Sequence, residues 1–435
     1  LKAARRGVQH RFNAAMRFFR QPIDSIMRRL IMAFAAAGLF ILLTFLPLFI
    51  YRCLFLSTNQ GALMWLEQQY AEVFRQTPKP FAFVDMAAWR QNFADLVARC
   101  GHKRIRIATK SIRCPDLMRT LAGHPQVDGW LCFSADEALY LAGLGFNNLL
   151  VAYPTLEPPR VTAVCRAVQQ GAQIVLMADS AAHLRALNRL AAAAGAVLPV
   201  ALDIDVSVAF PGIYFGVYRS SLRQAADLRA LLAILPDCPA LKLCGVMTYE
   251  AQIAGVTDAH NGKNGAYNAL VRLLKRRSLP HIRAWRQEIT QILQASGVEL
   301  AFFNGGGTGS LASTLADAAV TELTFGSGLF APALFDGYQD FQPRPAAGFA
   351  LEIVRRPRAD VYTCLGGGYM ASGSSGRDKL PLLMYPRGRL LANEGAGEVQ
   401  TPFRFSGSLD WPQDNFALFR HAKAGELCER FNELL

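Results

Sequence analysis

A short apolar run followed by a helical stretch recurs eight times between residues 104 and 325. The runs end, in order, at Lys110, Phe133, Tyr153, Ala178, Asp205, Tyr249, Asn304 and Phe325. Strands that alternate with helices in this way pair in parallel through right-handed crossovers. Eight such units in about 220 residues predict a (β/α)8 barrel. A doubly wound open sheet, which needs fewer strands, is the alternative.

Polar residues stand at the ends of several of these runs. Lys110 ends the first run, Asp205 the fifth and Tyr249 the sixth. Because the active site of such a barrel lies where the strands end and the loops begin, we expect these side chains to meet at one mouth. A lysine among apolar neighbours loses its proton more readily and can act as a nucleophile. We therefore expect Lys110 to be buried and reactive.

The segment "NGGGTGS", residues 304–310, follows the seventh run. Consecutive glycines let backbone N–H groups approach an anion closely, and Thr308 and Ser310 can add hydroxyl donors. The loops after strands seven and eight are the usual phosphate site of this barrel type, and the next segment, "LASTLAD", predicts a helix N-terminus there. A tight turn without a ligand is the alternative. The segment is not a nucleotide-binding P-loop, because it contains no Gly-Lys-[Ser/Thr].

A lysine at a strand end and a phosphate-binding loop at the same mouth predict pyridoxal 5′-phosphate (PLP) as the cofactor. The chain resembles the alanine racemase-like (fold-type III) PLP enzymes in several motifs, which occur in the expected order: "PFAFVDMAAWRQNFADL", "ATKSIRC", "LDIDVS", "MTYEAQIAG", "NGGGTGS", "TELTFGSGLF" and "EGAGEVQTP". It is most similar to the branch that contains D-threonine aldolase and D-serine dehydratase. The resemblance runs from about Pro80 to the end of the chain, some four-fifths of its length.

The resemblance implies a set of cofactor-binding residues. They are Lys110, Arg219, Tyr249, Gln252, Gly306, Gly307, Thr308, Gly309, Ser310 and Glu322. Lys110 would form the Schiff base and, with Tyr249, would be catalytic, while the glycine-rich segment would hold the phosphate. Arg219, in "GVYRSSL", resembles the arginine of the racemases' G-R-x-G segment, with a surface residue as the alternative. Glu322 would pair with the ring nitrogen, or else be a structural carboxylate at a strand end.

The implied substrate is a small D-amino acid. The first expectation is a PLP-dependent lyase that performs aldol cleavage or dehydration and deamination of a β-hydroxy D-amino acid, with an amino-acid racemase as the runner-up. A racemase needs an acid/base group on each face of the ring, which Tyr249 alone does not establish. Three further functions stay open: a PLP-binding protein without turnover, a barrel that binds nothing, and a barrel for a sugar phosphate or a flavin, which would leave Lys110 unexplained.

D-Threonine aldolase and D-serine dehydratase carry a divalent metal on an H-x-D or H-x-C pair near the C-terminus. The matching stretch here is "FRHAKAGELCERF", in which His421 is present but Lys423 stands at the position of the second ligand. An ammonium group does not bind a metal ion, and its charge repels a cation. The sequence therefore predicts no metal site. One hypothesis is that Lys423 supplies the missing positive charge.

Beyond the barrel, which is expected over residues 80–345, the pattern changes to short runs broken by Gly and Pro, such as "DVYTCLGGG" and "LPLLMYP". These runs predict a small antiparallel β domain over residues 346–435, joined by an early strand at residues 81–85. The resemblance further implies a homodimer, in which the partner's β domain closes the active site.

Residues 30–51 contain no charged side chain and are flanked by arginines. A helix of 22 residues at about 1.5 Å each spans roughly 33 Å, enough to cross a bilayer core. We expect residues 1–55 to form a basic arm and a single transmembrane helix, and residues 56–79 to form a linker. The protein would be anchored to a membrane by this single helix, and its catalytic part would be soluble. The membrane of an organelle is one candidate location. A cleaved signal sequence and an organelle-targeting arm are the alternatives.

The formal net charge of +13 does not indicate a nucleic-acid partner. Residues 1–52 hold nine Lys/Arg and one Asp, so the other 383 residues carry only +5. A nucleic-acid-binding protein needs a dense basic face on its folded domain. The nine cysteines are scattered and include no C-x-x-C, so the sequence predicts neither a disulfide framework nor a zinc ribbon.

Overall fold

The computed structural model of this protein describes residues 71–435, apart from residues 261 and 424. The segment expected to span a membrane, residues 30–51, lies outside the described residues, as do the rest of the basic arm and most of the predicted linker. Among the described helices, none is both long and apolar enough to cross a bilayer. Residues 72–435 form one compact unit.

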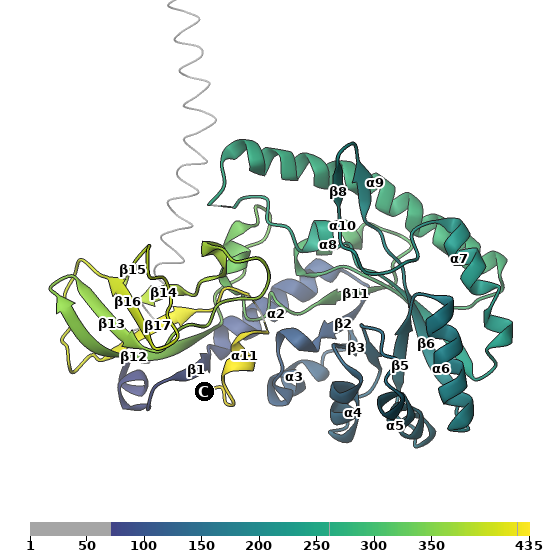
Figure 1. The fold of residues 1–435 in the computed structure, drawn as a ribbon, viewed down its shortest axis with the longest axis horizontal. Coiled ribbons are helices and arrows are strands. Elements are labelled where there is room, and N and C mark those ends of the chain that lie inside the picture. Colours follow the sequence, from purple (N-terminus) through teal and green to yellow (C-terminus); the bar gives the residue numbers. More distant parts are fainter. Residues whose placement is uncertain (1–70, 261, 424) are drawn as a thin grey trace, which may run out of the picture. The chain divides into compact units, whose positions relative to one another are not determined.

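Eight parallel strands close into a barrel (Figure 1). They are β2 (Arg104–Ala108), β3 (Val127–Cys132), β4 (Leu149–Val151), β5 (Ile174–Ala178), β6 (Leu198–Asp203), β9 (Leu241–Thr248), β10 (Phe302–Gly305) and β11 (Glu322–Phe325). The last strand, β11, pairs with the first, β2, with Leu323 opposite Ile105, so this sheet has no free edge. The prediction of an eight-stranded (β/α)8 barrel is confirmed.

Helices connect the strands and cover the outside of the barrel (Figure 1). They are α2 (Met86–Cys100), α3 (Pro115–Ala122), α4 (Ala135–Gly143), α5 (Pro158–Gln169), α6 (Ala181–Ala193), α7 (Ala225–Leu232), α8 (Ala251–Ala254), α9 (Gly265–Ala295) and α10 (Leu311–Leu315), with 3₁₀ turns η1 (Thr109–Ser111), η2 (Leu235–Asp237) and η3 (Thr308–Ser310). Two further 3₁₀ turns, η4 (Ala333–Gly337) and η5 (Arg377–Lys379), come after the last barrel strand. Serine side chains cap two of the helices. The side chains of Ser134 and Ser180 accept hydrogen bonds from the N–H groups of Glu137 and His183, which would otherwise lack a partner in the helix.

Apolar side chains fill the middle of the barrel. The inner cluster consists of Leu150, Ala152, Met177, Ala201, Met247 and Phe302. Phe302 lies so close to β9 that a Cβ on Gly245 would stand 2.2 Å from its ring, which explains why this strand position carries no side chain. Arg106 is also fully buried inside the barrel, where it pairs with Glu322 at 2.6 Å between Nε and Oε1. The barrel interior is therefore a packed core rather than a channel.

Strands that follow the barrel form an antiparallel sheet with one strand that precedes it. They are β12 (Ala347–Arg358), β13 (Val361–Leu365), β14 (Leu382–Tyr385), β15 (Arg389–Leu390), β16 (Gln400–Arg404) and β17 (Phe416–Arg420), with β1 (Phe81–Val84) paired to β12; a short helix, α11 (Leu427–Arg430), comes after β17. The sheet core is aromatic, because Phe349 and Phe419 stack 5.3 Å apart and Phe74 packs on Phe81 at 5.9 Å between ring centroids. The prediction of an antiparallel β domain after the barrel is confirmed.

A two-stranded hairpin, β7 (Val208–Phe210) with β8 (Ile213–Phe215), follows β6. The sequence analysis did not predict it, because strands of three residues are too short to show an alternating pattern. Val208 of the hairpin packs with Ile282 of α9 in a small apolar cluster. The segment after the hairpin contains Arg219 and returns to the barrel mouth.

Candidate active site

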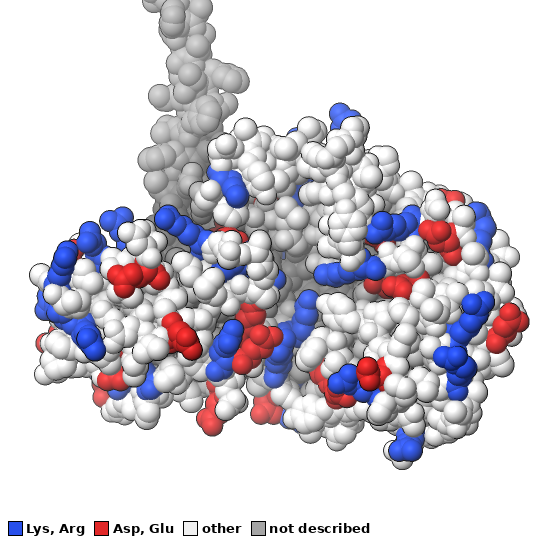
Figure 2. Space-filling model, in the orientation of Figure 1, with Lys and Arg blue, Asp and Glu red and all other residues white. Residues whose placement is uncertain are grey.

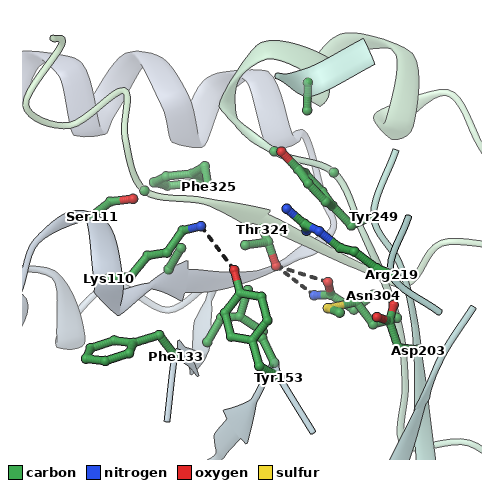
Figure 3. Close-up of a pocket in the computed structure, with 18 of the residues that line it drawn as sticks. Lys110, Ser111, Phe133, Tyr153, Asp203, Arg219, Tyr249, Asn304, Thr324 and Phe325 are labelled. Carbon is green, nitrogen blue, oxygen red and sulfur yellow. Dashed lines mark hydrogen bonds between the residues drawn. The ribbon is translucent and has the colours of Figure 1, made fainter. Parts of the chain in front are cut away.

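A cavity that is open to solvent lies at the carboxyl ends of the barrel strands. Six residues of the predicted cofactor set line it: Lys110, Arg219, Tyr249, Gly306, Gly307 and Thr308. Lys110 reaches the cavity from one side, and Tyr249 and Arg219 reach it from the other (Figure 3). The fold thus brings together residues that lie about 200 positions apart in the sequence.

Lys110 lies in the 3₁₀ turn η1, immediately after β2. Its Nζ donates a hydrogen bond to the hydroxyl of Tyr153, 3.1 Å away. The expectation that Lys110 is buried is wrong, because the turn carries the side chain past Ala108, the last strand residue, and leaves it exposed at the cavity. The sequence analysis did not name Tyr153 as a site residue. Its position at the end of the third run is the same signal that singled out Lys110.

The C-terminal segment of the chain holds the turn that carries Lys110. Arg113 Nε donates to the carbonyl oxygen of Lys110 at 3.1 Å, and the Arg113 guanidinium forms an ion pair with Glu429 at 2.6 Å. Gly425 packs directly on the same carbonyl, because a Cβ at this position would stand 2.3 Å from the oxygen. The chain beyond β17 therefore supports the lysine of its own barrel.

We expect Gly425→Ala to weaken binding of the cofactor and to destabilise the fold. The added methyl group would push the C-terminal segment away from the Lys110 turn, and the φ of +89° is unfavourable for alanine. Gly145→Ala is the matched control, since Gly145 has a φ of +87° but nothing within 4 Å of its Cβ position.

Backbone strain alone should cost about 1–3 kcal/mol of unfolding free energy in either variant. Only Gly425→Ala should also bind PLP more weakly, as measured by absorbance in a PLP titration of the folded protein. Equal PLP affinity in the two variants would show that the C-terminal segment does not support the lysine.

The glycine loop, residues 304–310, turns from β10 into η3 beside the cavity. Gly306 has a φ of +90°, which residues with a side chain rarely adopt. A Cβ on Gly307 would stand 3.0 Å from the ring of Tyr249, so the loop backbone lies directly against that ring. The Thr308 hydroxyl oxygen accepts a hydrogen bond from the N–H of Gly328 at 3.2 Å, which ties this loop to the loop after β11. Backbone groups of two loops thus converge on one side of the cavity.

Four residues of the predicted cofactor set do not line the cavity. They are Gln252, Gly309, Ser310 and Glu322. Gln252 is buried and donates to the carbonyl oxygen of Val206 at 2.7 Å. Gly309 lies against the backbone, since a Cβ there would stand 2.5 Å from the carbonyl oxygen of Ala254. Ser310 donates its hydroxyl to Glu250 at 2.9 Å. Contacts within the protein therefore involve all of these residues except Glu322, which is described next, and none of the four lines the cavity.

Glu322 differs most from its expected role as partner of a ring nitrogen. Its carboxylate accepts two hydrogen bonds from Arg106, at 2.6 and 3.0 Å, and one from Asn304 Nδ2 at 2.7 Å. Asn304 and Thr324 do line the cavity, and they exchange hydrogen bonds of 2.8 and 3.1 Å (Figure 3). The floor of the cavity therefore presents the neutral groups of Asn304 and Thr324, which the sequence analysis missed.

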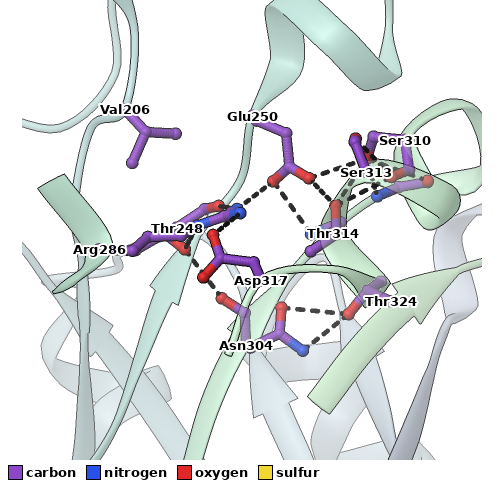
Figure 4. A network of polar contacts seen from close by, with 12 residues as sticks. Val206, Thr248, Glu250, Arg286, Asn304, Ser310, Ser313, Thr314, Asp317 and Thr324 are labelled. Carbon is purple, nitrogen blue, oxygen red and sulfur yellow. Dashed lines mark hydrogen bonds and ion pairs between the residues drawn. The ribbon is translucent and has the colours of Figure 1, made fainter. Parts of the chain in front are cut away.

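A buried ionic network supports the glycine loop (Figure 4). Arg286 of α9 pairs with Glu250 at 2.5 Å and with Asp317 at 3.2 Å. Glu250 also accepts hydrogen bonds from the N–H of Gly306 at 3.1 Å and from the Ser310 hydroxyl. Because Glu250 directly follows Tyr249 in the chain, the same network fixes the loop and the end of β9. The sequence analysis named neither Glu250 nor Arg286.

Arg219 and Tyr249 form one wall of the cavity. The guanidinium carbon of Arg219 lies 5.6 Å from the centroid of the Tyr249 ring, and Arg219 lies between Tyr249 and Asp203 (Figure 3). Burial raises the pKa of Tyr249 to about 12, although the nearby cation of Arg219 opposes this shift. The phenol therefore keeps its proton at neutral pH and can donate a hydrogen bond into the cavity.

The profile of the family described as "alanine racemase, N-terminal domain" matches residues 84–330, which is more than half of the chain. The chain belongs to this family. A D-threonine aldolase from an Arthrobacter species is 23% identical over 254 residues, which cover 58% of this chain and 60% of that protein. A 3-hydroxy-D-aspartate aldolase from Paracoccus denitrificans (strain Pd 1222) is 22% identical over 231 residues, which cover 53% of this chain and 53% of that protein. This chain thus spans 60% or less of the curated relatives it matches.

Solved structures of the alanine racemase family share this fold. A D-threonine aldolase from Filomicrobium marinum superposes with a TM-score of 0.67 and 18% identity over 82% of this chain and 90% of its own. A D-threo-3-hydroxyaspartate dehydratase from Delftia sp. HT23 superposes with a TM-score of 0.64 and 18% identity, over 82% of this chain and 94% of its own. An alanine racemase from Clostridium difficile 630 superposes with a TM-score of 0.57 and 14% identity, over 79% of this chain and 86% of its own. At these identities the likeness establishes the barrel and its β domain.

His421, the histidine at the predicted metal motif, is buried beside Phe330, whose ring it meets edge-on at 6.1 Å. Burial and the adjacent Arg420 lower the pKa of His421 to about 3, so its ring is neutral. In residues 71–435, as far as they are described, no three His, Cys, Asp or Glu side chains lie close enough to hold a metal. Lys423 is exposed near Ser372 and does not line the cavity, so its position does not support the hypothesis of a replacement charge.

Asp203, the last residue of β6, lines the cavity beside Arg219. Burial and the nearby carboxylate of Asp179 raise the pKa of Asp203 to about 7, although Arg219 opposes the shift. The sequence analysis named Asp205, which also lines the cavity and pairs with Arg223 at 3.2 Å, but it did not name Asp203. Asp203 stands two positions earlier in the same run, where alternate residues of a strand share a face.

We expect Asp203→Asn to raise the unfolding temperature more at pH 8 than at pH 4. A carboxyl whose pKa is raised by folding opposes folding above its ordinary pKa of about 4. This penalty grows as the pH rises and is complete once the pH exceeds the folded pKa, about 7. Asp116→Asn, on the exposed face of α3, is the control. Thermal unfolding at the two pH values measures the effect, and an Asp203→Asn shift that does not change with pH would contradict it.

Proposed function

We propose that this protein is a PLP-dependent lyase that acts on β-hydroxy D-amino acids, by aldol cleavage or by dehydration and deamination. The observation that carries the proposal is the cavity at the barrel mouth, which Lys110 and the glycine loop line together. Membership of the alanine racemase family supports PLP as the cofactor. The names of the curated relatives, D-threonine aldolase and 3-hydroxy-D-aspartate aldolase, support the substrate class.

The residues at the cavity fit PLP. Lys110 would hold the cofactor covalently through its amine, and the backbone N–H groups and hydroxyls of the glycine loop would hold the phosphate. Two loops leave their backbone bare at this place. Gly307 has no room for a Cβ, and a Cβ on Gly326, after β11, would stand 2.7 Å from the carbonyl oxygen of Ala108. The N–H groups of Gly306 and Gly307 already donate to Glu250 and to the Ser310 hydroxyl, so an anion would be held by other donors of the two loops. Such donors include the hydroxyls of Thr308 and Ser327, which line the cavity.

When bound, PLP withdraws electrons and stabilises negative charge at the α-carbon of an amino acid. Lys110, hydrogen bonded to Tyr153, would accept and return protons on one side of the cavity. Tyr249 keeps its proton and would donate a hydrogen bond from the other side, and Arg219 offers a cation to the substrate carboxylate. Aldol cleavage breaks the Cα–Cβ bond and moves the β-hydroxyl proton, whereas dehydration breaks the Cβ–O bond and releases water.

An amino-acid racemase is the second candidate, because Lys110 and Tyr249 reach the cavity from opposite sides (Figure 3). A racemase needs a proton donor or acceptor on each face of the substrate. Bond cleavage ranks first, because the curated relatives named above are both aldolases.

The test is incubation of the PLP-loaded protein with D-threonine, D-serine and D-3-hydroxyaspartate, with the L-enantiomers as controls. An aldolase releases an aldehyde and glycine, a dehydratase releases ammonia and a keto acid, and a racemase produces the enantiomer with neither. If no product forms and no amino acid changes the visible spectrum, the protein binds PLP without turnover and the proposal fails.

We further propose that residues 30–51 anchor the protein to a membrane and that it works as a homodimer. The uncharged length of that segment supports the anchor. The family resemblance and the open cavity support a dimer in which a partner covers the site. Release from membranes by alkaline carbonate would contradict the anchor, and a monomer by light scattering at assay concentration would contradict the dimer.

A further inference from the structure

Helix α9 is much longer than the barrel requires. It has 31 residues, whereas the other helices in the described part of the chain have 15 or fewer. In the half before Pro280, the buried side chains are Val271, Lys275 and Ser278. Lys275 is held on this inner face by an ion pair with Asp258 at 3.0 Å. The opposite face of this half faces solvent in the structure.

The solvent face of this half is apolar where a helix normally carries polar residues. Tyr267, Leu270 and Leu273 are 42%, 45% and 45% exposed. Their spacing of three residues places neighbours on the same side of the helix. Lys263 lies at one end, with its Nζ 5.6 Å from the Tyr267 ring centroid, and Arg277 follows Leu273 by four residues at the other. We call the solvent-exposed side of residues 263–277 the α9 face.

The sequence around the α9 face is basic and contains no acid. Residues 259–287 hold seven Lys/Arg and no Asp or Glu. Lys275 and Arg286 are engaged in buried ion pairs, whereas Arg276 and Arg277 are exposed. The β7–β8 hairpin packs beside α9 and adds Ile213, which is 40% exposed. Figure 2 shows mostly uncharged side chains along this edge of the molecule, which is consistent with an apolar strip bordered by cations.

We propose that the α9 face docks on the surface of a lipid bilayer that contains anionic headgroups. Half-exposed aromatic and leucine side chains bordered by Lys and Arg are typical of helices that lie in a membrane interface. Cations near an anionic bilayer add attraction, and no carboxylate in this stretch of sequence opposes it. A second copy of the chain fits less well, because two identical basic faces would repel each other. The segment at residues 30–51 gives an independent reason to expect a bilayer near this protein.

Hydrogen–deuterium exchange of the full chain tests this proposal locally. The protein is mixed with phosphatidylcholine vesicles with and without phosphatidylglycerol, and exchange is read in peptides that cover the α9 face. We expect about tenfold slower exchange with the anionic vesicles only, and a smaller effect in high salt. Because the readout is confined to α9, it does not depend on whether residues 30–51 enter the membrane.

The test variant is Leu270→Glu/Leu273→Glu, which should lose the protection while the cofactor site and the melting temperature stay unchanged. The matched control is Tyr140→Glu/Leu144→Glu, with Tyr140 on α4 and Leu144 directly after it. Their side chains are 60% and 37% exposed, and the first turn of α4 is acidic rather than basic. It should keep the protection of α9. Equal exchange with both kinds of vesicle would overturn the proposal. Protection that appears without lipid and grows with protein concentration would overturn it in favour of a second copy of the chain.

Discussion

Lys110→Ala is expected to abolish turnover and covalent retention of PLP, with a loss in rate of about 10³- to 10⁶-fold. Lys110 is the one lysine among the described residues that line the cavity. No other amine is placed to take its role, so the loss should be close to complete. Lys110→Arg should be equally inactive, because a guanidinium keeps the charge but does not form the covalent bond. It should still bind PLP reversibly through the glycine loop.

The measurement is visible absorbance, followed by borohydride reduction, proteolysis and mass spectrometry. In the unchanged protein the reduced adduct should lie on Lys110 alone. Lys242→Ala, an exposed lysine in β9, is the control and should retain the adduct and the activity. An adduct on another lysine, or activity that survives in Lys110→Ala, would refute the proposed role of Lys110.

Arg286→Met should destabilise the protein by about 3–5 kcal/mol. The substitution leaves two buried carboxylates, Glu250 and Asp317, without their cation. It should also weaken binding of PLP, because Glu250 holds the N–H of Gly306 only while the network keeps it in place. Urea unfolding and PLP titration measure the two effects. Arg104→Met, which breaks an exposed pair with Asp128, is the control and should cost less than about 1 kcal/mol.

The loss caused by Arg286→Met should shrink in acid. Burial opposes ionisation of Glu250, but Arg286, the hydroxyl of Thr314 and backbone N–H groups outweigh it and hold the pKa of Glu250 below its ordinary value. A carboxyl of this kind stabilises the fold above its unfolded pKa, and this contribution is lost as the pH falls through the folded pKa. The difference between variant and unchanged protein should therefore be smaller at about pH 3 than at pH 7. A difference that stays constant would mean that the carboxylates do not depend on Arg286.

A variant that also neutralises the carboxylates, Arg286→Met/Glu250→Gln/Asp317→Asn, separates charge from packing. It should recover part of the lost stability, because amides cost less to bury than unpaired carboxylates. It should not recover the affinity for PLP if the ionised Glu250 is what holds the glycine loop.

The barrel was predictable from the sequence because strands and helices leave different periods in the chain. Eight such alternations count the strands directly. Lys110 and the glycine loop were also predictable, because each follows a run and strand ends meet at one mouth. The antiparallel domain followed from short runs broken by Gly and Pro. These features depend on residues that are close together in the sequence.

Only the tertiary structure decided which polar groups are free for a ligand. Glu322 and Ser310 stand at the right places in the sequence, but partners 216 and 60 positions away, Arg106 and Glu250, engage them. Asp203 and Tyr153 reach the cavity, while Lys110 is exposed rather than buried. A local pattern records which side of a strand a residue occupies. It does not record the distant donor or acceptor that satisfies the side chain, and that pairing determines whether the group can act on a substrate.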